Sequence, residues 1–258
     1  MTEWDAGAYH RESTLQSWLA AQSLAALTLA GDDRVLDVGC GDGKVTVQIA
    51  RRLPRGRLLG IDPSHHMIDY AHRHLSAPNL AFAVADVRAL PCRGAFDLVV
   101  SFNALHWVPE QQRALESVRE ALAPGGRTFL QMVPRGERRA LEAVIEDTRS
   151  SPRWSRWFTD FRKPFLHLTP DEYAQVATAA GLTVERIDVQ ARRWDFETRD
   201  AFVRFADATF VEWTCMLPAE HRDAFIHDVL DRYATLAERP EDANAFLFYQ
   251  MEVVLRRP

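Results

Sequence analysis

The sequence of 258 residues has few cysteines and no cysteine pair at metal-binding spacing. Only Cys40, Cys92 and Cys215 occur, an odd number without a CxxC motif. A disulfide framework and a zinc site are therefore not expected, and the composition suits a reducing compartment. The chain also lacks a basic excess, because its formal net charge is -5. Nucleic acid is therefore not an expected partner.

Long apolar runs are absent as well. The start, MTEWDAGAYH, has neither the basic nor the apolar region of a signal peptide. The most apolar early stretch, WLAAQSLAALTLAG, is too short to span a bilayer and contains Gln22. These absences predict a cytoplasmic protein without a membrane partner. Hydrophobic residues make up 47% of the chain, which is enough to bury a full core.

Between residues 34 and 134, short apolar runs alternate with helix-period segments. Buried parallel strands are predicted for RVLDVG, RLLGID, LAFAVAD, FDLVVSF and GRTFLQMV, which are short and rich in branched or apolar residues. Between them, HHMIDYAHRHL and EQQRALESVREALAPGG place their apolar residues on one helical face, and Ser64 is placed to cap the first of these helices. The alternation predicts an α/β fold with a Rossmann-like, doubly wound, mostly parallel sheet.

The regular alternation ends after residue 135. SPRWSRWFTDFRKPF is dense in aromatic residues, and helical patterns accompany two late strand-like runs, LTVERIDVQARRWDF and NAFLFYQMEVVLRR. We expect both runs to extend the sheet to seven strands and the other material to form a helical and aromatic cap. No linker rich in proline, glycine or serine marks a second domain. We therefore expect one domain over residues 1–258, with an N-terminal helical lid at 1–33, a ligand-binding core at 34–134, and late strands plus cap helices at 135–258.

The segment VLDVGCGDGKVT is the strongest ligand-binding motif. A strand ends at Gly39, the chain turns through Gly41, and a helix begins near Lys44. Small residues let the backbone approach a ligand at the carboxyl ends of the strands, where α/β sheets bind ligands. The next strand ends in Asp62, whose carboxylate can accept hydrogen bonds from both hydroxyls of a ribose.

Two features separate this motif from a dinucleotide site. The GxGxxG pattern would place its third glycine at position 44, which is Lys44 here. Asp37 lies near the end of the first strand, where it would repel a pyrophosphate but suit an ammonium or sulfonium group. The third strand ends in VAD, which places Asp86 where it can accept from an adenine amino group. A nicotinamide oxidoreductase is thus only a further alternative.

In this order and spacing, LDVGCGDG, GIDPS, ADV and FDLVVSFNALHW resemble class I S-adenosylmethionine-dependent methyltransferases. The resemblance covers residues 34–134 and implies S-adenosyl-L-methionine as the cofactor. It implies that Gly39 and Gly41 line the methionine part and that Asp62 binds the ribose. The other cofactor-binding positions that we expect are Asp37 near the ammonium or sulfonium group, Pro63 and Met67 on the adenosine, Asp86 and the Val87 amide at the adenine, and Phe102 and Asn103 at the amino-acid end. Tyr9 either closes over the cofactor or anchors the N-terminal segment.

Features outside this core suggest the methyl acceptor. The pair HW after the fourth strand and the aromatic segment resemble trans-aconitate methyltransferases and insect juvenile hormone acid methyltransferases, both of which methylate carboxylates. AYHRESTLQSW resembles an element of plant salicylate-type carboxyl methyltransferases, in which a glutamine and a tryptophan clamp the substrate carboxylate. The matching positions are Gln16 and Trp107. The resemblance implies a small or medium organic acid as the acceptor.

A carboxylate clamp agrees with the chemistry of methyl transfer. A carboxylic acid with a pKa near roughly 4 is ionised at neutral pH and needs no general base. In-line displacement mainly requires that the nucleophile is positioned. A glutamine amide and an indole N–H can orient the carboxylate without neutralising its charge. His106 would then shape the pocket beside Trp107.

Other readings of these residues stay open. His106 as a general base would imply an N, C or phenolic O acceptor. Trp107 can instead pack the start of the next helix, and Gln16 can be solvated. The aromatic residues of the late segment are either ordinary core or a lid over the acceptor, and their density in a region with few strands favours the lid: Trp154, Trp157, Phe158, Phe161 and Phe165. A cofactor-binding protein without transferase activity is another alternative. The sequence predicts no metal site and does not indicate an oligomeric state.

Overall fold

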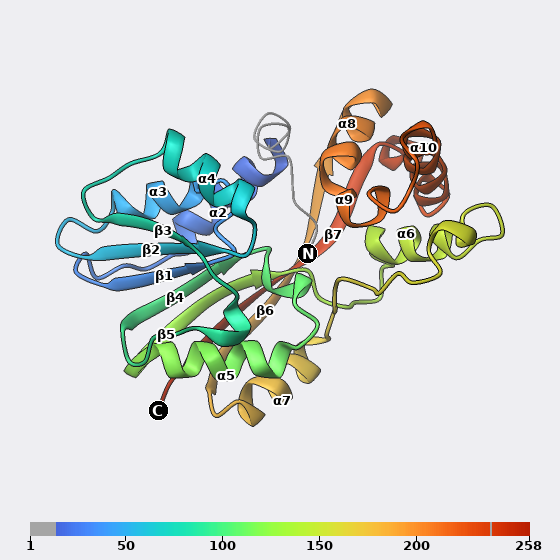
Figure 1. The fold of residues 1–258 in the computed structure, drawn as a ribbon. Helices are drawn as coiled ribbons and strands as arrows, with labels where there is room; N and C mark the ends of the chain where they lie inside the picture. The colour runs from blue at the N-terminus through green and yellow to red at the C-terminus, as the bar shows by residue number, and fades with distance from the viewer. Residues whose placement is uncertain (1–13, 238) are drawn as a thin grey trace.

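The computed structural model describes residues 14–237 and 239–258, in which seven strands form one sheet (Figure 1). The strand order is β3-β2-β1-β4-β5-β7-β6. The strands are β1 (Arg34–Val38), β2 (Arg57–Asp62), β3 (Leu80–Val84), β4 (Phe96–Phe102), β5 (Leu122–Met132), β6 (Thr183–Asp195) and β7 (Ala245–Arg256). The first five are parallel, and β7 runs antiparallel to both β5 and β6. The predicted doubly wound, mostly parallel, seven-stranded α/β sheet is confirmed.

The order of the strands creates a crevice at the carboxyl end of β1. Chain connections from β1 lead through β2 to β3 on one side, and the chain then crosses to β4 on the other side of β1. Ligands of open α/β sheets bind where the strand order reverses in this way. The topology therefore predicts a ligand-binding site among the loops that follow β1, β2 and β4.

Helices cover both faces of the sheet (Figure 1). Helices α2 (Thr14–Ala26), α3 (Lys44–Ala50) and α4 (His65–His74) lie on one face, and α5 (Gln111–Ala121) and α7 (Pro170–Ala179) lie on the other. Local sequence fixes their ends. The Ser64 hydroxyl caps α4 by accepting a hydrogen bond from the Met67 amide at 3.3 Å, as predicted. Thr169 and Glu172 form a capping box at the start of α7.

The remaining helices form the cap, together with the segment between α6 and α7 and the ends of β6 and β7 beside it (Figure 1). These helices are α6 (Leu141–Arg149), α8 (Arg199–Thr209), α9 (Val211–Thr214) and α10 (Ala219–Ala234). The described chain also has short 3-10 turns, η1 (Val87–Ala89), η2 (Leu105–Trp107), η3 (Ser155–Trp157) and η4 (Pro240–Asp242), of which η3 lies between α6 and α7. Helix α8 ends at Thr209, and Phe210 separates it from α9. No described helix has both the length and the apolar character required to cross a membrane.

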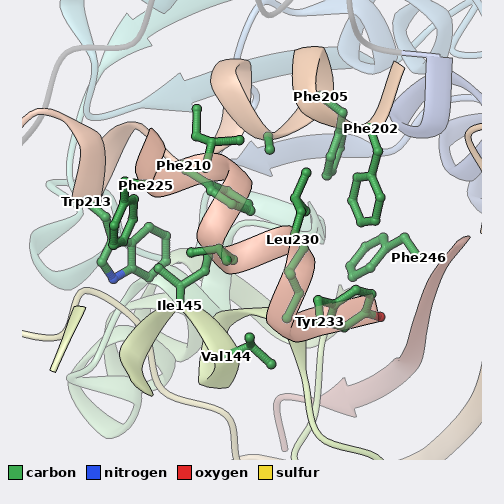
Figure 2. Close-up of a cluster of buried hydrophobic side chains, with 14 of the residues drawn as sticks. Val144, Ile145, Phe202, Phe205, Phe210, Trp213, Phe225, Leu230, Tyr233 and Phe246 are labelled. Atoms are coloured by element: carbon green, nitrogen blue, oxygen red, sulfur yellow. The ribbon is translucent and has the colours of Figure 1, made fainter. Parts of the chain in front are cut away.

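The cap has its own core, which is largely aromatic. Figure 2 shows Phe202, Phe205 and Phe246 facing residues of α6 and α10. Two buried indoles in this region find anionic partners, since Trp154 Nε1 donates to Asp228 at 2.7 Å and Trp213 Nε1 donates to a Glu146 oxygen at 2.8 Å. Buried indole N–H groups usually have such a partner. The cap is therefore a packed unit beside the sheet.

Candidate active site

The glycine turn joins the end of β1 to the end of β2. The amides of Gly39 and Cys40 both donate to the Ile61 carbonyl, at 2.8 and 2.9 Å. Gly39 has a φ of 72°, and a Cβ there would lie 2.1 Å from the Cβ of Ala104. Gly41 has a φ of 54°, but a Cβ there would meet no described atom within 4 Å. Packing therefore requires glycine at position 39, whereas the backbone of Gly41 borders open space into which a ligand can come.

Asp62 ends β2 beside this turn. Its carboxylate accepts from the Gly41 amide at 3.0 Å and from the Ser64 amide at 2.9 Å, one bond to each oxygen. These bonds fix the orientation of the carboxylate. Pro63 follows it, half-buried, and Met67 is buried on α4. The position of Asp62 is compatible with the predicted contact to a ribose.

Asp37 is the most deeply buried acid of the site, with 1% of its surface exposed. Its Oδ2 atom accepts from the Thr46 hydroxyl at 2.7 Å, whereas Oδ1 has no hydrogen-bond partner among the described residues. Burial raises the pKa of Asp37 to about 7; the Thr46 bond opposes this shift and the charge of Asp62 adds to it. A nearby cationic group would stabilise the ionised carboxylate.

Asp86 lies at the start of η1 and is bound by a side chain that sequence reasoning missed. The Arg88 guanidinium donates to both oxygens of Asp86, with Nε–Oδ1 at 3.0 Å and Nη2–Oδ2 at 2.6 Å, and also binds Glu110 at 2.9 Å. These bonds from Arg88 lower the pKa of Asp86. Asp86 can therefore accept from an adenine only through lone pairs that Arg88 leaves. Val87, whose amide is the other predicted adenine contact, is buried.

The loop after β4 has a constrained backbone. Phe102 ends the strand, and Asn103 adopts a φ of 56°, which is uncommon for a residue other than glycine. The Asn103 amide donates to the Gln131 carbonyl at 2.8 Å. Its side-chain oxygen accepts from Gln250 Nε2 of β7 at 3.0 Å. Gln250 is thus a supporting residue that sequence reasoning did not identify, because it lies 147 positions away.

A cavity of about 130 Å³ opens between this loop and the cap. Its aromatic walls come from η2, α8, α9, β7 and the residue between α8 and α9: Trp107, Phe205, Phe210, Trp213, Phe246 and Phe248. The polar side chains that line it are Asn103, His106, Glu142 and Thr209, and no lysine or arginine of the described chain lines it. Because Asn103 belongs both to this wall and to the loop after β4, the cavity adjoins the predicted cofactor site.

The predicted acceptor residues reach this cavity in part. Trp107 lines it, and its ring also makes edge contacts with Trp213 and Phe165, at centroid distances of 5.9 and 6.2 Å. Trp107 therefore packs against the cap as well as facing the cavity. Gln16 lies on α2, which supplies Leu15 and Leu19 to the wall, but its side chain is outside what the structure describes. Tyr9 also lies outside the described residues.

His106 lines the cavity but is buried, with 3% of its surface exposed. Burial lowers the pKa of its imidazole well below the ordinary value, and the neighbouring His167 adds to the shift. Burial also lowers the pKa of His167 to about 4 and raises that of Glu142 to about 6. His106 is therefore a neutral imidazole at pH 7. Glu142 was missed because it belongs to a helix 36 positions further along the chain.

The aromatic segment predicted as a lid has a different position. None of its five residues lines the cavity: Trp154, Trp157, Phe158, Phe161 and Phe165. Trp154, Phe158 and Phe165 are buried in the cap core, and the other two pack against it half-buried. The alternative that they are ordinary core is closer to the structure. The aromatic walls come instead from segments that pack onto the loop after β4.

Known proteins match both the motifs and the fold. A methyltransferase-domain family matches residues 35–126, which contain the glycine turn, Asp62 and Asp86. A trans-aconitate 2-methyltransferase of Methylobacterium nodulans is 32% identical over 72% of this chain and 71% of its own length. Another, of Streptomyces coelicolor, is 31% identical over 89% of this chain and 78% of its own.

A solved methyltransferase structure has a similar fold. Phosphoethanolamine N-methyltransferase 2 of Haemonchus contortus, in complex with S-adenosyl-L-methionine, has a TM-score of 0.58 and 16% identity, covering 92% of this chain and 52% of that one. The likeness at this identity concerns the fold alone. Together with the matched family domain and relatives above 30% identity, the glycine turn and its acids establish S-adenosyl-L-methionine as the cofactor. The chain belongs to the class I S-adenosylmethionine-dependent methyltransferases.

Proposed function

We propose that this enzyme methylates a carboxylate oxygen of a small or medium organic acid that has an apolar body. The observation that carries the proposal is the cavity beside Asn103, which six aromatic rings enclose and which contains Trp107. Apolar walls with a few placed polar groups are typical of small-molecule sites. The trans-aconitate methyltransferase relatives support a carboxylate acceptor.

The same cavity favours an acid with few charges. Trans-aconitate carries three carboxylates, and binding several negative charges away from water requires cationic partners. No lysine or arginine among the described residues lines the cavity, and Glu142 adds an acid to its wall. We therefore infer that the acceptor differs from the compound in the relatives' name and has one carboxylate at the cofactor end.

Different residues of the chain would bind the cofactor and position the acceptor. S-adenosylmethionine, when bound, supplies a methyl group on a positively charged sulfur. Asp37 and Asp62 would hold its amino-acid and ribose parts. Trp107 and Gln16 would donate hydrogen bonds to one oxygen of the acid, which directs the other oxygen at the methyl group. The acceptor is already ionised at neutral pH, so no proton has to move.

A second candidate keeps the fold and cofactor but uses an N, C or phenolic O acceptor. The observation in its favour is His106, a neutral buried imidazole in the cavity wall whose Nδ1 has no described hydrogen-bond partner. Such a group can take a proton from an acceptor. A cytoplasmic location, without nucleic-acid or membrane partners, remains our expectation for either candidate.

A panel of acceptors tests the proposal. The enzyme is incubated with methyl-labelled S-adenosylmethionine and apolar monoacids, tricarboxylic acids, phenols and amines of similar size. We expect label in methyl esters of apolar monoacids, recognised by mass and by release of methanol in mild alkali. Each acid is matched with its alcohol as a control for the carboxylate. Label only in phenols or amines would contradict the proposal and favour the second candidate.

A further inference from the structure

Three metal-ligating side chains converge at the base of the cap. His106 comes from η2, Glu142 from the first turn of α6, and His167 from the segment before α7. One nitrogen or oxygen atom of each lies within 4.8 Å of the other two. The positions are up to 61 residues apart in sequence, so only the packing of the cap onto the loop after β4 brings them together.

The three side chains also have buried polar atoms without partners. His106 Nδ1, Glu142 Oε2 and His167 Nε2 are buried and form no hydrogen bond with a described residue. Buried polar atoms are usually paired, and an unpaired one calls for a water or ion. The rings of His106 and His167 lie 5.6 Å apart between centroids, and the backbone oxygen of His106 accepts from the Leu166 amide at 2.8 Å. The two imidazoles are thus held together by the backbone.

The donor set fits a transition-metal ion. Two imidazole nitrogens and one carboxylate oxygen are the three protein ligands of many zinc sites that keep an open coordination position. Ligand atoms about 2.0–2.2 Å from a metal lie at most about 4.4 Å apart, so a small side-chain movement would complete the set. Lys163, whose charge acts on His167, opposes a cation, and the Glu142 carboxylate offsets it.

We propose that His106, Glu142 and His167 bind one divalent transition-metal ion of the zinc type. His106 and Glu142 line the cavity, so the open position of the ion would face the acceptor. The ion would be one centre of positive charge in a wall whose described side chains include no lysine or arginine, which suits an acceptor with a single carboxylate, and it would bind an oxygen of that acceptor. Metal binding does not depend on the proposed function; only the contact with an acid rests on it.

Metal titration tests the site without cofactor or acid. Protein without a histidine tag is treated with chelator and titrated with zinc by calorimetry, and with cobalt(II) by visible absorption. We expect one ion per chain. His106→Gln, Glu142→Gln and His167→Gln should each weaken binding by more than the roughly 10–100-fold typical of outer-shell changes. His74→Gln and His227→Gln are the controls, because the exposed His74 lies on α4 and the half-buried His227 lies on α10, outside the three-residue cluster. Both control variants should bind the metal with native affinity.

The outcomes separate the alternatives. The absence of binding would overturn the site. Binding that the control variants lose and the three site variants keep would assign the metal to an adventitious surface ion only. If a site variant does not fold, zinc-edge X-ray absorption of the native protein still reads the ligands: two imidazoles and an oxygen support the site, and a shell without imidazole refutes it. Adding an acid that the enzyme methylates should change the absorption spectrum of the bound cobalt(II). An unchanged spectrum would overturn the contact with the acceptor but leave the carboxylate chemistry to the acceptor panel.

Discussion

The cofactor core and the cap gather their functional residues in different ways. In the core, Asp37 lies near the end of β1, Gly41 follows β1 and Asp62 ends β2, and the parallel sheet brings these two strand ends to one edge. In the cap, the cavity wall combines Glu142 of α6 with Phe246 of β7, 104 positions apart. A local motif therefore determines the core site, whereas the proposed acceptor site depends on how distant segments pack. Variants should separate the two, because a change in one region should leave the function of the other intact.

The largest effect is expected from Asp62→Ala in the core. The change removes the acceptor that we predict for the ribose hydroxyls, together with the acceptor for the Gly41 and Ser64 amides. Hydrogen bonds to a charged group contribute roughly 1.5–3 kcal/mol each, so two of them correspond to a loss of affinity for S-adenosylhomocysteine of about 100-fold or more. Calorimetry measures the affinity, and the rise in melting temperature with this ligand should disappear. NAD should stabilise neither protein.

The matched control is Asp69→Ala, an exposed acid on α4 that pairs with Arg73. It should bind the ligand as the native protein does. An Asp62→Ala variant whose affinity stays within twofold of native would show that this carboxylate does not hold the ribose.

The next effect is expected from the acceptor clamp. Trp107→Phe keeps the ring but deletes its N–H, and Gln16→Leu deletes the amide. Each variant should lower kcat/KM for an acid that the native enzyme methylates by about one to two orders of magnitude, because one hydrogen bond to a charged group is lost. Affinity for S-adenosylhomocysteine should barely change. The double variant should lose less than the sum if both donors hold one carboxylate.

Two results would contradict the clamp. If both single variants keep native kcat/KM on every accepted acid, neither donor holds the acceptor. If Trp107→Phe also loses cofactor affinity, the indole supports the fold through its contacts with Trp213 and Phe165, and the core and the cap are less separable than we infer.

A smaller effect concerns the pH dependence of cofactor binding. The pKa of Asp37 is raised from 3.8 to about 7 in the folded chain, so the folded state holds this proton more tightly than the unfolded state. Asp37 alone should therefore lower stability as pH rises from about 4 to about 7. A cationic ligand group favours the ionised form, so affinity for S-adenosylhomocysteine should rise by up to about tenfold between pH 6 and pH 8. Calorimetry at several pH values measures this rise.

Asp37→Asn provides the reference for that titration. The variant retains any titration of the ligand itself but lacks the carboxylate, so its affinity should change less with pH than that of the native protein. Equal pH dependence in the two proteins would mean that Asp37 does not sense the charge of the ligand.

The smallest functional effect is expected deep in the cap. Trp154→Phe deletes the N–H bond to Asp228, and the free energy of unfolding should fall by about 1–3 kcal/mol. Urea unfolding measures the change, and the half-buried neighbour variant Trp157→Phe should cost less. Cofactor affinity should stay native in both. A loss of cofactor affinity in Trp154→Phe would break the proposed separation of core and cap.

The features of the core that could be predicted share a local origin. Short runs of branched or apolar residues mark the five parallel strands, Ser64 caps α4 as expected, and Gly39, Gly41 and Asp62 lie together at the strand ends. Arg88 was missed even here, although it is only two positions from Asp86, because nothing in the motif indicates which way a flexible guanidinium folds.

The cap could be predicted only in outline. Its helices have recognisable patterns, but the sequence cannot indicate which aromatic face meets the loop after β4. The dense segment with Trp154 and Phe158 became core, and Phe205, Phe246 and Glu142 reached the cavity from three separate elements. Long-range packing decides these contacts, and periodicity along a single chain carries no information on it.

A crystal structure of the complex with S-adenosylhomocysteine tests most directly the central claim that cofactor and acceptor sites meet at the end of β4. We predict both ribose hydroxyls within hydrogen-bond distance of the Asp62 carboxylate, about 2.6–3.2 Å. The amino-acid end should lie near Asp37 and Asn103, with the sulfur facing the cavity that contains Trp107. Adenosine bound at another edge of the sheet, or a sulfur turned away from that cavity, would contradict the account.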